Sequence, residues 1–197
     1  MNRILRYITH PQVQIDPRVP VPQWGLSEVG RERAIRFAAL PLLSATTTIV
    51  SSAETKAVET AEIISTTLGV SVSIREKTHE NDRTATGFLE PQEFERVANQ
   101  FFASPLESAR GWEKAVDVQS RITSEAKHII GKHLHGDLLM VGHGAVGTLL
   151  YCHLADVEIN RKYDQPGGGG HMFAYDLDSQ ACLHPWKSIE QVAGMSC

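Results

Sequence analysis

Short apolar runs alternate with longer amphipathic stretches along most of the chain. Runs rich in β-branched and aromatic residues, which are typical of strands, occupy residues 4–9, 46–52, 70–74, 137–142 and 171–177. Residues 181–184 follow the last run closely enough to pair with it as a hairpin. The first four runs are short, and two of them are almost continuously apolar, as buried parallel strands are. The pattern predicts an α/β fold with a mostly parallel sheet.

Helical signals fill the intervals between these strands, over residues 27–43, 54–68 and 112–133 and again after residue 143. Ser27 can cap the first helix, and Gly69 can end the second. In the third segment, apolar side chains recur every three or four positions, which predicts a long helix with one buried stripe.

Residues 76–111 are less regular, and their only helical passage is the stretch at 90–102. Insertions of this kind often cover a binding site. Because no low-complexity linker divides the chain, we predict a single domain over residues 1–197 with a cap-like insertion at about 76–111.

Composition excludes several classes of function. The 197 residues carry a formal net charge of −4 and contain no run rich in Lys and Arg, so we expect no nucleic-acid partner and no membrane-surface binding. No apolar run approaches the ~20 residues of a membrane span, and the first residues do not resemble a signal peptide, which favours a cytoplasmic protein. Three cysteines without C-x-x-C spacing, the last at position 197, argue against a disulfide framework and a thiolate zinc site.

Two histidines come directly after predicted strands. His10 follows the strand at 4–9 and precedes Pro11, and His143 follows the strand at 137–142. Ligands of open parallel sheets bind beyond the carboxyl ends of the strands. A single histidine in such a place could merely cap its strand, but two at equivalent strand ends indicate a shared site if the strands are neighbours.

The segment GHGAVG at residues 142–147 also matches the glycine pattern of a dinucleotide site. That interpretation requires a second strand with an acidic residue some 20 positions further on, and this distance falls on Asp164 within NRKYDQPGGGG. Only about fifty residues remain after the motif. The sequence therefore argues against a dinucleotide site.

Four segments, in the right order, resemble the histidine phosphatase superfamily, also called phosphoglycerate mutase-like. They are ITHP at 8–11, WGLSEVGRERA at 24–34, SSAETKAVETAEII at 51–64 and MVGHGAVGTLL at 140–150. Any one match would be weak, but together they cover most of the chain. The resemblance implies a three-layer α/β/α sandwich with a mostly parallel central sheet.

The resemblance also implies a metal-independent phosphatase that needs no cofactor. His10 would attack a phosphomonoester and form a phosphohistidine, and His143 would donate a hydrogen bond to the transferring group. Glu80 matches the carboxyl group that protonates the leaving oxygen, with Asp82 as a second candidate. The substrate would be a phosphorylated small molecule or a phosphoprotein.

The chain departs from the family pattern at both usual arginines. Thr9 stands where the family has arginine before the nucleophile, and Lys56 replaces the second arginine. We expect Lys56 to point into the crevice and Arg83 to serve as a substitute phosphate-binding cation. Two alternatives stay open: a catalytically weak relative that binds phosphorylated ligands, and a partner-binding domain without an anion site. A mutase is less favoured, because the chain is short.

Overall fold

The central sheet has six strands in the order β3-β2-β4-β1-β5-β6 in the computed structural model, which describes residues 2–194. Cys197 lies outside the described residues. The strands are β1 (Ile4–Thr9), β2 (Thr46–Ser51), β3 (Val72–Ile74), β4 (Asp137–Gly142), β5 (His171–Asp176) and β6 (Ala181–Ser188). The first four are mutually parallel, whereas β5 runs antiparallel to β1 and β6 antiparallel to β5. The predicted α/β fold, with its mostly parallel sheet and its terminal hairpin, is confirmed.

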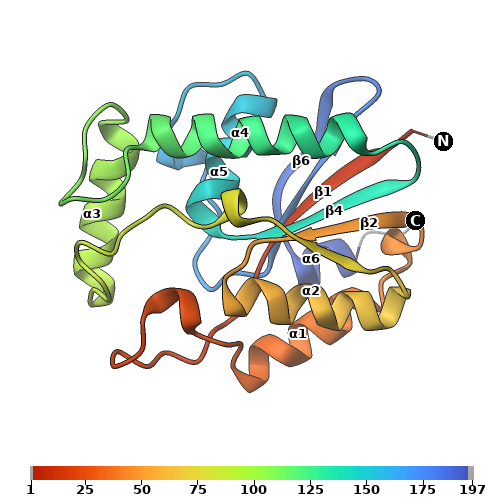
Figure 1. Cartoon of the computed structure of the whole chain (residues 1–197), viewed down its shortest axis with the longest axis horizontal. Helices are drawn as coiled ribbons and strands as arrows, with labels where there is room; N and C mark the ends of the chain where they lie inside the picture. The colour runs from red at the N-terminus through yellow and green to blue at the C-terminus, as the bar shows by residue number, and fades with distance from the viewer. Residues whose placement is uncertain (1, 195–197) are drawn as a thin grey trace.

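Helices cover both faces of the sheet and make three layers (Figure 1). They are α1 (Glu28–Ala38), α2 (Thr55–Leu68), α3 (Pro91–Ala103), α4 (Ala115–Lys132), α5 (Gly144–Leu154) and α6 (Ile189–Ala193). One core cluster lies between the sheet and α4 and α5, and a second lies between the sheet and α1, α2 and α6. Among residues 2–194, no helix combines the length and apolarity needed to cross a membrane.

Element boundaries differ from the sequence prediction in places with a local cause. The helix expected over 27–43 ends at Ala38, and Pro41–Leu43 forms a separate 3-10 turn. Pro41 lacks an amide hydrogen and disfavours a helical residue before it, so the helix cannot continue. Gly69 does end α2, in the left-handed conformation with φ of 68°.

The strand ends place the candidate site. Thr9 lies opposite Gly142 in the parallel pairing of β1 with β4, so the residues that follow these strands share one edge of the sheet. The two histidine-bearing strands are therefore neighbours, which meets the condition for a shared site. Within the insertion, α3 lies beyond the carboxyl ends of these strands, apart from the main sandwich (Figure 1). This arrangement sets α3 over the edge of the sheet where the two histidines emerge.

Candidate active site

Backbone contacts fix His10 at the end of β1. Its N–H donates to the carbonyl of Gly142 at 3.0 Å, and its own carbonyl accepts the N–H of Gly170 at 3.0 Å. A side chain at Gly169 would put a Cβ atom 2.2 Å from the His10 carbonyl oxygen, and Gly169 has a φ of 65°. Glycine is therefore needed at position 169 for the close approach of the two segments.

The ring of His10 is held in one tautomer. Its Nδ1 lies 2.8 Å from the carbonyl oxygen of Pro11. Because a carbonyl only accepts hydrogen bonds, Nδ1 carries the hydrogen and Nε2 carries a free lone pair. Burial and the positive charge of Lys56 lower the pKa of His10 to about 4, against the opposing effect of the Pro11 bond. The imidazole is neutral at pH 7, as a nucleophile must be.

His143 is fully buried, and its ring centroid lies 5.3 Å from that of His10. Its Nε2 is 2.8 Å from Oγ of Ser52. The hydroxyl of Tyr7 accepts the His143 N–H at 3.0 Å and donates to the His143 carbonyl at 3.2 Å. Burial lowers the pKa of His143 well below its ordinary value. The two imidazoles therefore face each other at one strand edge, both neutral.

The glycine pattern that mimics a dinucleotide motif has a packing role here. A Cβ atom would lie 2.1 Å from the Tyr7 hydroxyl at Gly142, and 2.4 Å from the Tyr7 ring at Gly147. Both glycines make room for Tyr7, which in turn holds the backbone of His143. The geometry agrees with the rejection of a dinucleotide site.

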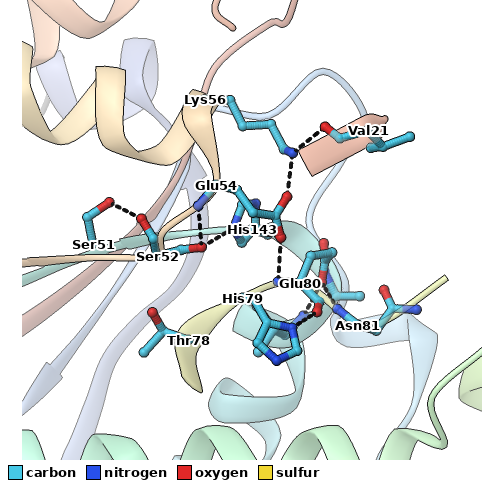
Figure 2. A network of polar contacts seen from close by, with 12 residues as sticks. Val21, Ser51, Ser52, Glu54, Lys56, Thr78, His79, Glu80, Asn81 and His143 are labelled. Atoms are coloured by element: carbon cyan, nitrogen blue, oxygen red, sulfur yellow. Dashed lines mark hydrogen bonds and ion pairs between the residues drawn. The ribbon is translucent and has the colours of Figure 1, made fainter. Parts of the chain in front are cut away.

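Lys56 is buried, and its ammonium group is already paired (Figure 2). Its Nζ donates to the carboxylate of Glu54 at 2.5 Å and to the carbonyl of Val21 at 2.9 Å. The sequence predicts that Lys56 points into the crevice as a cation available to phosphate, whereas in the structure its ammonium group is bonded to Glu54 and Val21. Its charge lies near His10 but is neutralised by a carboxylate.

Glu54 is the residue that sequence reasoning missed. Its carboxylate contacts Lys56, accepts the backbone N–H of Glu80 at 2.9 Å and lies 3.5 Å from Nε2 of His143. Burial alone would raise the pKa of Glu54, but the nearby ring of His143, the ammonium group of Lys56 and the hydrogen bond from the N–H of Glu80 outweigh it and lower the pKa to about 2. A buried, charged carboxylate thus stands among the groups expected to bind phosphate. Its place soon after β2, at the same strand edge as the histidines, was an available signal.

Glu80 lies at the N-terminus of α5. Its carboxylate accepts the N–H groups of Asn81, Ala145 and Val146 at 3.0, 3.2 and 2.9 Å. An anion is favourable there because the helix dipole is positive at that end. The second candidate, Asp82, is exposed, and its carboxylate accepts the N–H of Thr84.

A cavity of about 390 Å³ borders His10 and Glu80. Its aromatic wall is made of Phe94, Phe101 and Phe102 from the cap and of Trp112, which directly follows the cap. The guanidinium of Arg83 lines this cavity and lies 5.1 Å from the ring centre of Phe94. Thr9, by contrast, is fully buried and bonds to the side chain of Gln165 at 2.6 Å, so it brings no charge to the site.

An α/β/α sandwich with two histidines at neighbouring strand ends, under a cap helix, is the architecture of phosphoglycerate mutase-like proteins. The family model described as histidine phosphatase superfamily (branch 1) matches residues 13–178, and the chain belongs to this superfamily. The match begins at residue 13 and so does not include His10.

Solved structures share the fold at low sequence identity. Mycobacterial glucosyl-3-phosphoglycerate phosphatase is 19% identical, with a TM-score of 0.74 over 95% of this chain and 97% of its own. Bacillus stearothermophilus YhfR is 22% identical, with a TM-score of 0.76 over 93% and 95%. Phosphoserine phosphatase from Entamoeba histolytica, in complex with 3-phosphoglyceric acid, is 15% identical, with a TM-score of 0.77 over 94% and 98%. No curated protein matches the sequence.

Proposed function

We propose that this chain is a metal-independent phosphatase that transfers a phosphoryl group from a phosphomonoester to water through a phosphohistidine at His10. The state of the His10 ring carries the proposal. The ring is neutral, its Nδ1 is committed to the Pro11 carbonyl, and its Nε2 lone pair is free. The enzymatic character of the family, and the phosphatases among the structural neighbours, support hydrolysis.

In the first step, Nε2 of His10 attacks phosphorus, the P–N bond forms and the P–O bond to the organic group breaks. The departing oxygen takes a proton from the carboxyl group of Glu80, which borders the same cavity as His10. In the second step, water attacks the phosphohistidine and gives its proton to the carboxylate of Glu80. The P–N bond breaks, inorganic phosphate leaves, and both side chains return to their starting state.

Charge and hydrogen bonds hold the phosphoryl group during both steps. We assign this role to His143, whose ring centroid lies 5.3 Å from that of His10, and to Lys56 and Arg83, whose positive charges both lower the pKa of His10. The lysine offers a point charge where the family has a planar fork. A weak or inactive relative that binds phosphorylated ligands, or a mutase-type phosphotransferase, stays the alternative.

The test is His10→Ala, measured by hydrolysis of phenyl phosphate and by labelling with a ³²P phosphodonor. Wild type is expected to hydrolyse the ester and to show a label that is acid-labile and stable in alkali, as phosphohistidine is. His10→Ala should lose both while remaining folded, and His128→Ala, which changes an exposed histidine on α4, should keep both. Binding of phosphate without turnover in wild type would favour the inactive-relative alternative. A label that persists in His10→Ala would refute His10 as the nucleophile.

A further inference from the structure

We propose that the cavity under α3 selects small phosphomonoesters whose organic body is flat and carries a hydrogen-bond acceptor, rather than phosphoproteins. This inference rests on the proposed function, because it concerns the group that leaves when His10 is phosphorylated. We infer the chemistry of the leaving group from the side chains that line the cavity and from a polar group there that has no hydrogen-bond partner.

The walls favour a flat, apolar body. Phe94 and Trp112 have ring centres 5.8 Å apart, and the guanidinium of Arg83 lies over both rings. Planar groups stack favourably on aromatic rings and on guanidinium planes. The volume of about 390 Å³ is at the small end for ligand cavities, which suits one or two rings.

The spare polar group of the cavity is a donor. Asn81 is 4% exposed, and its Nδ2 has no hydrogen-bond partner among residues 2–194. A buried amide left unpaired is unfavourable, so this group favours a ligand that supplies an acceptor. The carboxylates that border the cavity are already engaged: Glu80 binds the N-terminus of α5, Glu95 pairs with Arg161, and Asp164 accepts the hydroxyl of Thr148.

Free O-phosphotyrosine and a phosphotyrosyl peptide test the size limit, because both have the same aryl leaving group. We expect kcat/KM to be at least about tenfold higher for the free amino acid. For the acceptor, Asn81→Leu should lower kcat/KM about tenfold more for O-phosphotyrosine than for phenyl phosphate, which lacks an acceptor. Gln100→Leu, on the exposed side of α3, is the matched control and should alter neither substrate.

Each result bears on a different claim. Equal turnover of the peptide and the free amino acid, or an equal effect of Asn81→Leu on both small substrates, would overturn the inference. Phenyl phosphate also reports whether the variant is folded. If wild type shows no turnover of phenyl phosphate that depends on His10, the proposed function fails, and the inference fails with it.

We also infer that Glu54 acts as an internal anion that competes with the phosphoryl group for the site. This second inference rests on different contacts. Three groups converge on the Glu54 carboxylate: Nζ of Lys56, the backbone N–H of Glu80 and, at 3.5 Å, Nε2 of His143 (Figure 2). Two of these, Lys56 and His143, are the groups that the proposed function assigns to phosphate.

A carboxylate and a phosphoryl group both accept hydrogen bonds and both carry negative charge. They cannot share the same donors at close range without repulsion, which is strong where water is excluded. The Glu54 side chain is 10% exposed, so solvent does little to screen it. A bound phosphomonoester must therefore displace Glu54 from Lys56.

Glu54→Gln keeps the size of the side chain and removes its charge. Calorimetry with inorganic phosphate should give a Kd at least about tenfold lower than in wild type, because Lys56 is then available to the ligand. Glu59→Gln is the matched control, since Glu59 lies on α2, the helix that Glu54 precedes, but pairs with Arg31. Its phosphate affinity should equal that of wild type.

Phosphate affinity that is unchanged or weaker in Glu54→Gln would overturn this inference. Glu54→Ala supplies the same comparison if the glutamine variant does not fold. Failure of the proposed function gives a different result: phosphate binds more tightly in Glu54→Gln, yet neither protein is labelled at His10. Tighter binding together with His10 labelling supports both claims.

Discussion

Replacing Tyr7 by phenylalanine tests whether one buried hydroxyl positions the second histidine. Tyr7 is 1% exposed, and its hydroxyl both accepts the N–H of His143 and donates to its carbonyl. The carbonyl has a further donor in the N–H of Gly147 at 3.2 Å. In Tyr7→Phe, the N–H of His143 would lose its hydroxyl partner in a site closed to water. Burial raises the pKa of Tyr7, so the lost group is a neutral hydroxyl at every accessible pH.

The expected loss in the free energy of unfolding follows from that one unpaired N–H group. A buried N–H without a partner destabilises a protein by about 1–3 kcal/mol, whereas the removal of one oxygen atom leaves little cavity. Urea unfolding should therefore show a lower midpoint with an unchanged slope. Tyr175→Phe is the control: Tyr175 is also buried, its hydroxyl makes no hydrogen bond to a described residue, and its loss should cost less than about 0.5 kcal/mol.

A double-mutant cycle sharpens the test. A Cβ atom at Gly142 would lie 2.1 Å from the Tyr7 hydroxyl oxygen, the closest atom it would meet. Gly142→Ala should thus be strongly destabilising alone and less so in the Tyr7→Phe background, giving non-additive free energies. In addition, kcat for phenyl phosphate should fall in Tyr7→Phe, because His143 is less well positioned. A cost below about 0.5 kcal/mol, with additive effects, would refute the role assigned to the hydroxyl.

Two further predictions concern pH and the loop that carries the proposed acid. The pKa of His10 is lowered to about 4, so below its ordinary value of 6.5 the unfolded chain takes up a proton that the folded chain does not. Stability should therefore fall as pH drops from 6.5 towards 4, by at most about 2 kcal/mol at pH 5, and not change above 6.5. Urea unfolding of His10→Asn at pH 7.5 and 5.0 should show a smaller loss, and an equal loss would contradict the assignment. The second prediction concerns Arg121, which donates to the carbonyls of Lys77 and His79 in the loop before Glu80. Arg121→Met should destabilise the fold by about 1–3 kcal/mol and raise KM for phenyl phosphate. Arg36→Met, on the exposed face of α1, is the control and should do neither.

Much of the fold could be predicted because its signals are local. Apolar runs predicted the strands, and Gly69 predicted the end of α2. The positions of His10 and His143 after their strands predicted the edge of the sheet at which they meet. The break at Pro41 was also present in the sequence, since proline cannot continue a helix from the preceding turn. The capping box of Ser188 and Gln191, which starts the short helix α6, was an equally local signal.

The pairing of Glu54 with Lys56 could not be predicted in the same way. Residues two apart in a helix do not face each other, so the spacing gave no reason to expect a contact. Glu54 is the residue before the helix and has an extended backbone, with φ of −71° and ψ of 137°, which turns its side chain back towards Lys56. The contact of Glu54 with the backbone of Glu80 depends on how a loop 26 residues away closes over the strand edge. Such contacts arise from tertiary packing and produce no repeating pattern in the sequence.

The charges at the site connect substrate binding to the proposed chemistry. Lys56 and Arg83 bring two positive charges near His10, and Glu54 and Glu80 bring two carboxylates, so the four side chains balance one another without a ligand when all are ionised. A phosphomonoester dianion adds about two negative charges, which a largely buried site cannot hold unless something compensates for them. Displacing Glu54 from Lys56 frees one cation, and protonating Glu80 removes one negative charge. In the mechanism that we propose, the protonated form of Glu80 is also the form that donates to the leaving oxygen, so the state expected to bind the dianion best is the state that is ready to react.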